Sequence, residues 1–357
     1  MSMQIVGLST ASPDHVLSQD NAVEMLQRLC CETPKQAKIA DHLIRRTGVT
    51  QRNTCVPHSR AYDWEDQPSG PTLAERMDLY EQHAAPLAIQ AGRGALEDAD
   101  IDPGRVTHLV TVSCTGFEAP GVDIQLIESL GLPLEVQRVH VGFMGCHAAI
   151  NGLRVAQGLV AGNKNATVLL VATELCSLHY AYGWKPEQFV SNAIFGDGSA
   201  AVVGVPGPAD ADNADSCAWR LTATGSRIFA DSQNLMSWRV RDNGFEMTLS
   251  SELPGVIENE LSGWLTTWLQ RQGHSLDQVG SWAVHPGGPR IVTAVENALG
   301  LSSSATSTSR EVLETHGNMS SPTILFILER MRASQAPGPC VAIGFGPGIA
   351  AEVAVFE

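Results

Sequence analysis

The sequence predicts an α/β protein built from two similar halves. Short, continuous apolar runs such as 108–113 and 166–172 alternate with longer segments of helical periodicity, which is typical of a parallel sheet covered by helices on both faces. In addition, the order glycine turn, small residues, helix, polar loop and apolar strand occurs at 142–172 and again at 317–344. This repeated order predicts a duplicated fold whose matching turns face one another at a shared cleft.

The boundary between the halves is predicted at a polar, turn-forming stretch, 206–213, which divides the chain into 1–205 and 206–357. Within the first half, apolar runs predict strands and 3.6-residue periodicity predicts helices. The expected strands are 3–9, 108–113, 136–141, 166–172 and 198–205, and the expected helices are 20–29, 79–98, 123–130 and 146–161. The stretch 30–71 is polar and irregular, and no element is predicted there.

The same two patterns continue through the second half. The expected strands are 219–226, 282–284, 340–344 and 349–356, and the expected helices are 254–272, 289–299 and a helix that opens at 317–321 and runs to 331. Strands and helices therefore alternate in both halves, as a covered sheet requires.

Composition and charge exclude several classes of function. With 43% hydrophobic residues, 17% charged residues and a net charge of −15, the 357-residue chain is typical of a globular protein. Nucleic acid is not expected as a partner, because phosphate binding needs clustered Lys and Arg.

We expect no signal peptide and no membrane span, since no basic start and no run of about 18 apolar residues is present. The eight scattered cysteines show no zinc spacing, which favours free thiols in a reducing cytoplasm and no metal site.

Cys146 lies where the apolar strand 136–141 breaks at glycine and a helix begins. At a helix N-terminus, unpaired N–H groups and the macrodipole favour a thiolate and can receive an oxyanion. Cys146 is therefore a candidate nucleophile. The alternative is a buried cysteine that acts as a small hydrophobe.

Two further turns carry reactive groups beside apolar elements. His285 follows a strand and precedes a Pro-Gly-Gly-Pro turn, and Asn318 stands before a helix. Either residue alone is consistent with a structural role, as a strand-end histidine or a helix N-cap. With Cys146 they form the series Cys, His, Asn, which also suits a papain-like protease. A nucleophile in the middle of a repeated α/β pattern argues against that class.

Five motifs then run in order along most of the chain. They are Gly142-Phe143-Met144-Gly145-Cys146, Ile194-Phe195-Gly196-Asp197-Gly198-Ser199-Ala200-Ala201, Val284-His285-Pro286-Gly287-Gly288-Pro289, Gly317-Asn318-Met319-Ser320-Ser321 and Gly344-Phe345-Gly346-Pro347-Gly348. In this order they resemble the type III polyketide synthases, the chalcone and stilbene synthase-like group. The resemblance implies a thiolase-like fold, in which duplicated βαβαβ halves form a layered α-β-α-β-α arrangement.

The resemblance also implies an acyltransferase chemistry. Cys146 would take an acyl group from a starter acyl-CoA as a thioester, and His285 and Asn318 would handle malonyl-CoA. Loss of CO2 from malonyl leaves an enolate, which two donors aimed at the thioester oxygen would stabilise. His285, if protonated, would hold Cys146 as the thiolate. CoA thioesters enter as substrates, and no bound redox cofactor or metal is implied.

Two other motifs are expected to shape the cavity. Phe195 resembles the gatekeeping phenylalanine of the family, whose apolar wall favours conversion of the malonyl carboxylate to CO2, although core packing is the alternative. Gly344-Phe345-Gly346-Pro347-Gly348 has the glycines of a nucleotide loop. The segment 349–356 after it alternates as a strand and offers no helix N-terminus to a phosphate, so we expect a hairpin-like turn.

The lining of the cavity indicates the substrate. The positions carried over from the plant enzymes hold Cys114, Ala119, Cys176, His179 and Met247. Plant chalcone synthases mostly carry Thr or larger residues at these positions. Because this sequence departs from that pattern, the lining argues against a bulky aromatic starter. Thr115, Ala119 and Cys176 resemble the lining of bacterial alkylpyrone-forming members, and small side chains with a flexible methionine leave room for a linear chain. We expect an alkylpyrone or alkylresorcinol from a long-chain fatty acyl starter.

Three alternatives stay open on the sequence. Cys114 also fits naphthol-forming members that take malonyl as starter, a ketoacyl synthase III-like enzyme would condense once, and a non-catalytic member would bind acyl-CoA or act as a scaffold.

The candidates for binding CoA are Arg45, Arg46 and Lys38. They belong to a basic run that also holds Arg52, and the alternative is that this run is a solvated face. The resemblance further implies a homodimer.

Overall fold

The computed structural model describes residues 2–57, 69–207 and 219–357. Beyond its first two positions, the predicted linker 206–213 lies outside the described residues. Within the described ranges, no helix is both long enough and apolar enough to cross a membrane. Those ranges also contain no group of three or more His, Cys, Asp or Glu side chains arranged to hold a metal ion.

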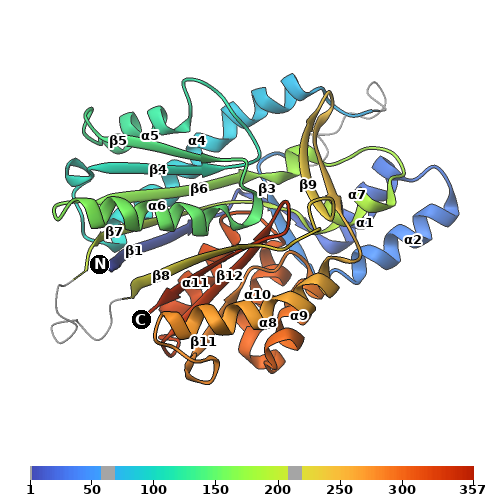
Figure 1. The fold of residues 1–357 in the computed structure, drawn as a ribbon. Helices are drawn as coiled ribbons and strands as arrows, with labels where there is room; N and C mark the ends of the chain where they lie inside the picture. Colours follow the sequence, from blue (N-terminus) through green and yellow to red (C-terminus); the bar gives the residue numbers. More distant parts are fainter. Residues whose placement is uncertain (1, 58–68, 208–218) are drawn as a thin grey trace.

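In the described part of the chain, nine strands form one mixed sheet in the order β11-β12-β13-β8-β1-β7-β6-β4-β5 (Figure 1). The strands from the first half are β1 (Met3–Ala11), β4 (His108–Ser113), β5 (Gln137–Gly142), β6 (Val168–Leu175) and β7 (Asp197–Pro206). Those from the second half are β8 (Arg220–Ile228), β11 (Ser281–Val284), β12 (Cys340–Gly346) and β13 (Ala350–Phe356). The two sets join where β1 pairs with β8, at Met3 and Gln4.

The strand order of the second set repeats that of the first. β4 lies parallel to β6, β6 antiparallel to β7, and β7 antiparallel to β1. In the same way, β11 lies parallel to β12, β12 antiparallel to β13, and β13 antiparallel to β8. The predicted repeat is thus confirmed, whereas the prediction of a parallel sheet is wrong for β1, β7 and β8. The antiparallel β13 agrees with the hairpin-like turn expected before it. β7 is buried on both faces along most of its length, so its sequence is as continuously apolar as that of a parallel strand.

Three layers of helices alternate with the two sets of strands, which confirms the predicted α-β-α-β-α arrangement (Figure 1). The outer layer of the first half holds α4 (Leu73–Asp98) and α5 (Val122–Leu130), the central layer holds α6 (Ala148–Gly162) and α11 (Thr323–Ala333), and the outer layer of the second half holds α8 (Leu253–Arg271) and α9 (Pro289–Leu299). Strand β6 illustrates the layering. Leu169 and Val171 pack with the first outer layer, and Val168 and Leu170 pack with the central one.

Several elements have no counterpart in the sequence prediction. They are α2 (Pro34–Arg45), a two-stranded ladder of β2 (His15–Ser18) and β3 (Gln51–Thr54), α7 (Pro186–Ile194), a hairpin of β9 (Met236–Arg241) and β10 (Gly244–Leu249), and α10 (Ser307–His316). Helix α1 (Gln19–Cys30) follows its prediction closely. For α2 the sequence does carry a start signal, since Thr33 and Gln36 form a capping box and Pro34 occupies the first turn. The apolar side that packs inward is narrow, with Ala40 and Ile44 as its buried residues, so the stretch reads as mostly polar.

Candidate active site

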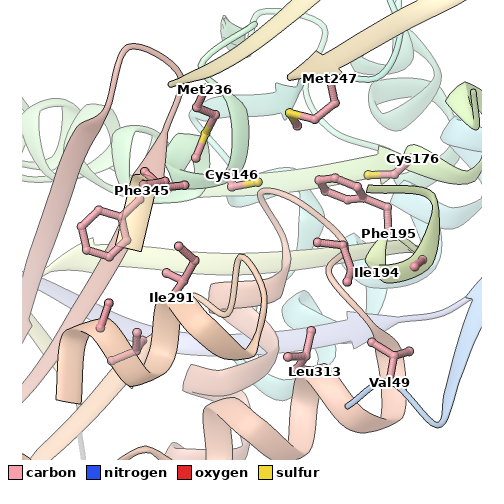
Figure 2. Packing of buried hydrophobic residues seen from close by; sticks show 14 of the residues in the cluster. Val49, Cys146, Cys176, Ile194, Phe195, Met236, Met247, Ile291, Leu313 and Phe345 are labelled. Carbon is pink, nitrogen blue, oxygen red and sulfur yellow. The ribbon is translucent and has the colours of Figure 1, made fainter. Parts of the chain in front are cut away.

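The structure brings Cys146, His285 and Asn318 together at the seam between the two halves. Cys146 precedes α6, His285 is the first residue after β11, and Asn318 precedes α11. All three line one small cavity, together with Phe195 and Phe345. Figure 2 shows Cys146 between these two aromatic side chains. The central layer thus presents the starts of both of its helices to the same space.

The backbone turns sharply just before Cys146. Phe143 (φ +56°) and Gly145 (φ +77°) both adopt the left-handed region. A Cβ atom on Gly145 would lie 2.5 Å from Cδ of Pro347, so this close approach of two turns requires glycine. Gly145–His147 then form a 3-10 turn ahead of α6. Cys146 is therefore fixed inside a tight turn before the helix, and the predicted helix start at Cys146 is shifted to Ala148.

Asn318 is held through its backbone and its side chain. Its N–H donates to the carbonyl of Ile194 at 2.8 Å, and its carbonyl accepts from the N–H of Gly196 at 3.0 Å. These bonds form a parallel bridge between Asn318 and Phe195. The side-chain Oδ1 accepts from the N–H of Ser320 at 2.8 Å, which leaves Nδ2 as a donor 3.9 Å from the Cys146 sulfur.

His285 is 1% exposed, and neither of its ring nitrogens has a hydrogen-bond partner among the described residues. Its backbone N–H donates to the carbonyl of Ile343 at 2.8 Å, which fixes the residue against β12. Buried polar groups are usually hydrogen-bonded within the protein. An imidazole without a partner on the wall of the Cys146 cavity is therefore free to bond to a substrate.

Burial determines the protonation of the Cys146 and His285 pair. It raises the pKa of the Cys146 thiol to about 11, against smaller opposing contributions from hydrogen bonds to Ser320 and Asn318. It lowers the pKa of His285 to about 3, and the neighbouring His147 adds to this shift. Burial therefore opposes a charge on either group in the free protein, against the thiolate that the helix start was expected to favour.

Glu174, at the end of β6, joins the two halves beneath the site. Its Oε2 accepts from the N–H of Cys114 at 2.9 Å and from Oγ1 of Thr115 at 2.7 Å, and its Oε1 accepts from Oγ of Ser321 at 2.6 Å. One fully buried carboxylate thus couples the end of β4 to the turn that carries Asn318. Burial raises the pKa of Glu174, and these hydrogen bonds oppose the rise. The sequence prediction missed this residue, although an acidic residue within an apolar strand is a visible signal.

Three cavities of about 10, 20 and 20 Å³ lie around Cys146 and Phe195, and each is the size of roughly one or two water molecules. Phe195 and Met247 line all three cavities, and Met236 lines the two that contain Cys146 (Figure 2). The cavities are therefore compartments of one space, divided by three movable side chains.

Most of the predicted lining residues lie on these walls. The residues in contact with at least one cavity are Cys114, Thr115, Cys176, His179, Phe195 and Met247. Ala119 differs, since it is exposed on the loop after β4 and lines none of the three. Met236 and Trp238 are lining residues that the sequence prediction missed, because it did not predict the β9–β10 hairpin that carries them.

His179 holds the walls in place. Its Nε2 lies 2.6 Å from the carbonyl of Thr115, and its Nδ1 accepts from the N–H of Phe245 at 3.1 Å, which assigns the proton to Nε2. The ring also stacks on Phe245, with 4.2 Å between the ring centroids. Burial lowers the pKa of His179 to about 3. This neutral ring therefore ties the loop after β4 to the hairpin.

The segment 344–348 forms the end of β12 and the start of the turn, 347–349, that leads to the antiparallel strand β13, which agrees with the expected hairpin-like turn. Phe345 and Pro347 line cavities next to Cys146. Gly344 and Gly346 pack on His147, and a Cβ atom on Gly346 would lie 2.2 Å from the imidazole. Gly348 (φ +79°) completes the turn. The turn thus supports the residue that follows Cys146.

A surface pocket of about 540 Å³ lies over the starts of α8 and α9, and Arg46 and Arg290 line it. Leu253 and Ile291, in the same two helix starts, line the buried cavity of Cys146. These two segments therefore separate the pocket from the buried cavity. Arg290 was not among the predicted cations, and its place at the start of a predicted helix is the only signal in the sequence.

The other two predicted cations lie elsewhere. Arg45 pairs with Asp20 at 3.0 Å and with Asp41 at 2.8 Å, and Lys38 is exposed on α2. Neither residue lines the surface pocket. Of the three candidates, the structure therefore brings only Arg46 to the pocket that adjoins the site.

Residues 2–208 match the family described as the N-terminal domain of chalcone and stilbene synthases, and residues 220–357 match the C-terminal domain of the same family. The chain belongs to the chalcone and stilbene synthase family. It is accordingly a type III polyketide synthase, an acyltransferase, as the five motifs indicate.

Several characterised relatives cover almost the whole synthase. The alpha-pyrone synthesis polyketide synthase-like Pks18 of Mycobacterium tuberculosis is 31% identical over 99% of this chain and 90% of its own length. The 1,3,6,8-tetrahydroxynaphthalene synthase of Streptomyces peucetius is 31% identical over 98% of this chain and 91% of its own. The crystal structure of PKS-I from the brown alga Ectocarpus siliculosus superposes with a TM-score of 0.93 at 29% identity, covering 100% of this chain and 98% of the other.

Proposed function

We propose that the synthase extends an acyl-CoA starter with malonyl-CoA by repeated decarboxylative condensation on Cys146. The observation that carries this proposal is the single cavity lined by Cys146, His285 and Asn318. The thiol comes from the first half of the chain, and the two polar groups come from the second. This separation lets the acyl chain and the extender unit approach from different walls.

In the loading step, the Cys146 sulfur attacks the thioester carbonyl of the acyl-CoA while its proton passes to His285. The bond between the carbonyl carbon and the CoA sulfur then breaks, and His285 returns the proton to the CoA thiolate. A base must be neutral to accept the proton. Burial, which lowers the pKa of His285, keeps the ring neutral in the free protein. The same shift makes the free ring a weak base, so the transfer requires the cavity to stabilise the thiolate–imidazolium pair as it forms.

In the extension step, malonyl-CoA loses CO2 and its electron pair passes into an enolate. A ring N–H of His285 and the Nδ2 of Asn318 would donate to the enolate oxygen. The enolate carbon attacks the acyl group on Cys146, the carbon–sulfur bond breaks, and the Cys146 thiolate takes a proton. The product is a 3-ketoacyl-CoA, which returns to Cys146 for the next condensation.

A long-chain fatty acyl starter and an alkylpyrone or alkylresorcinol product form the more specific part of the proposal. Cys114 and Cys176 leave little bulk on the walls, and Met236 and Met247 are unbranched side chains that can change rotamer at low cost. The separate cavities are too small for a chain, so Phe195 and these methionines must move on binding. The alpha-pyrone activity in the name of the mycobacterial relative supports this choice.

A malonyl-primed, naphthol-forming activity is the second candidate. Cys114 lines the cavity beside Cys146, and the name of the Streptomyces relative states that it makes a tetrahydroxynaphthalene. Such an enzyme would need no fatty acyl-CoA. The two candidates therefore differ in starter and not in catalytic residues.

A starter panel tests the proposal. The purified synthase is incubated with malonyl-CoA and acyl-CoAs of graded length, and products and protein are analysed by mass spectrometry. We expect an acyl adduct on Cys146, none in the Cys146→Ser variant, and products that gain the mass of the supplied chain. Product from malonyl-CoA alone, with no effect of added acyl-CoA, would identify the naphthol-type activity. The absence of any adduct would identify a non-catalytic binding protein.

The surface pocket is proposed as the entrance for CoA. Arg46→Glu and Arg290→Glu together are expected to raise KM about tenfold or more for both CoA substrates, because each removes a cation that would meet a phosphate. The limiting kcat should change little, since neither residue lines the cavity of Cys146. Steady-state kinetics measure both constants.

Arg45→Glu is the matched control for this experiment. It makes the same charge change as Arg46→Glu alone, on the neighbouring residue, but Arg45 is exposed and already paired with Asp20 and Asp41. We expect a KM close to that of the unaltered protein. An equal rise in KM for Arg45→Glu would assign the effect to overall charge and remove the pocket from the proposal.

A homodimer is proposed on the basis of the exposed edge of the sheet. β5 is the last strand of the described sheet, and the side chains of Phe117, Val139, Phe143 and Met144 are exposed on or beside it. A second copy that covers this edge would bury apolar surface and satisfy an open strand. Sedimentation equilibrium should give twice the chain mass of 38.1 kDa, and a monomer mass would contradict the proposal.

A further inference from the structure

Arg52 on β3 is a buried cation with an unusual lack of partners. Its side chain is 1% exposed, and neither Nε nor Nη2 has a hydrogen-bond partner among the described residues. Its Nη1 donates to the carbonyl of Ala193, in the last turn of α7. In the described part of the chain no carboxylate lies within ion-pair distance of it. Because an unpaired buried charge is costly, its presence calls for a function.

The side chain of Arg52 packs against the point where two loops of the active site cross. These loops carry Phe195 and Asn318, and the backbone bonds from Asn318 to Ile194 and from Gly196 to Asn318 join them. Figure 2 shows Ile194, the last residue of α7, and Phe195, which follows it. When this crossing is held in place, Phe195 and Asn318 are therefore held in place relative to each other.

Two glycines at this crossing lie close to the stem of Arg52. A Cβ atom on Gly196 would lie 3.1 Å from Cβ of Arg52, and one on Gly317 would lie 3.4 Å from the same atom. Gly317 also has φ +68°, which a larger residue adopts only with strain. The chain thus keeps both loops in contact with one side chain.

The guanidinium also reaches the Phe195 loop through an aromatic ring. It lies 5.4 Å from the ring centroid of Tyr180, whose hydroxyl donates to the carbonyl of Phe195 at 2.8 Å. A guanidinium can donate to the end of α7 and cover an aromatic face at once, because it is planar and has several donors. A lysine ammonium offers a single point of attachment.

We propose that Arg52 is a positioning residue that fixes the crossing of the Phe195 and Asn318 loops, and through it the Asn318 amide that meets the malonyl thioester oxygen. This inference rests on the proposed function, since it assigns Arg52 to the decarboxylation step. It predicts that Arg52 acts on extension and leaves the loading of Cys146 nearly unchanged.

The test separates the two half-reactions in the full-length protein. Acylation of Cys146 is followed by intact mass, and decarboxylation is followed as acetyl-CoA released from malonyl-CoA alone. Arg52→Met is expected to lower the kcat of decarboxylation about tenfold, because displaced donors lose transition-state contacts, with the KM for malonyl-CoA and the acylation rate nearly unchanged. Arg52→Lys should also lower the kcat of decarboxylation and leave the acylation rate nearly unchanged, but with a smaller decrease. This variant replaces Arg52→Met in the test if Arg52→Met does not fold.

A double-mutant cycle identifies the residue through which Arg52 acts. If Arg52 works by placing Asn318, Arg52→Met should cost little further decarboxylation activity in an Asn318→Ala background. Arg76→Met is the matched control, because Arg76 is also 1% exposed and donates to the carbonyls of Pro71, Leu178 and Tyr180. That variant should lower both half-reactions and the melting temperature together.

The outcomes distinguish this inference from the proposed function. If the unaltered protein neither acylates nor decarboxylates, the proposed function fails. If it does both, but Arg52→Met slows both steps equally or its effect multiplies with that of Asn318→Ala, the inference about Arg52 is overturned and the proposed function stands.

Discussion

Asn318→Ala is expected to slow the decarboxylation of malonyl-CoA by about 10²- to 10³-fold, the usual cost of removing one donor from a developing oxyanion. The amide of Asn318 lies on the wall of the cavity that holds Cys146, and its Nδ2 is the donor left free by the bond from Ser320 to Oδ1. Loading uses the thiol and His285, and the Asn318 amide touches that step only through its long 3.9 Å hydrogen bond to the Cys146 sulfur. The acylation rate, measured by intact mass, should therefore stay within about threefold.

Asn165→Ala provides the matched control for this loss. Asn165 is exposed in the turn after α6, at the opposite end of the helix from Cys146. Both half-reactions should keep their rates in this variant. An Asn318→Ala protein that loses acylation as strongly as decarboxylation would show that Asn318 supports the thiol or the local fold, and the proposed division of roles would be wrong.

The alkylation rate of Cys146 by iodoacetamide is expected to rise about tenfold for each pH unit between pH 7 and pH 10, without a plateau. The thiolate is the reactive form, and burial raises the pKa of Cys146 to about 11, so about 10⁻⁴ of the protein carries a thiolate at pH 7. Peptide mapping of the adduct separates Cys146 from the other cysteines.

The same experiment tests the protonation of His285. Because burial lowers its pKa to about 3, no inflection is expected near pH 6.5. A rate that is already maximal and flat from pH 5 to pH 9 would instead identify a thiolate paired with an imidazolium. In that case the loading step would begin from a Cys146 thiolate paired with a His285 imidazolium, and not from a thiol beside a neutral imidazole.

Much of the fold follows from the sequence because its strands are short apolar runs separated by amphipathic helices. The repeat was visible in the same way, since the turn before α6 and the turn before α11 are rich in glycine and small residues. The antiparallel direction of β7 could not be predicted from the sequence. A strand buried on both faces is continuously apolar whether it runs parallel or antiparallel to its neighbours. The β9–β10 hairpin was missed because its strands are half-exposed and mixed in polarity.

The candidate site was predictable in part. Cys146, His285 and Asn318 lie in turns next to apolar elements, and such turns at the ends of buried strands are where reactive groups converge. Met236 acts through contacts that depend on tertiary packing, so its position in the sequence gives little signal. Glu174 was visible as an acidic residue within an apolar strand, but its partners depend on tertiary packing. The protonation of Cys146 was also beyond the sequence. A helix start indicates the direction of one contribution to the pKa, and the burial of Cys146, which raises its pKa, is visible only in the structure.

The duplicated strand order also has a consequence for how this chemistry could arise. The first residue after β4 is Cys114 and the first after the equivalent strand β11 is His285, while Cys146 and Asn318 precede the equivalent helices α6 and α11. The same backbone arrangement thus borders the Cys146 cavities from both halves, with unlike side chains at matching positions. In the proposed function, the first copy of the scaffold supplies the nucleophile and the second copy supplies the hydrogen-bond donors. The side chains of Cys114, Cys146, His285 and Asn318 determine this difference.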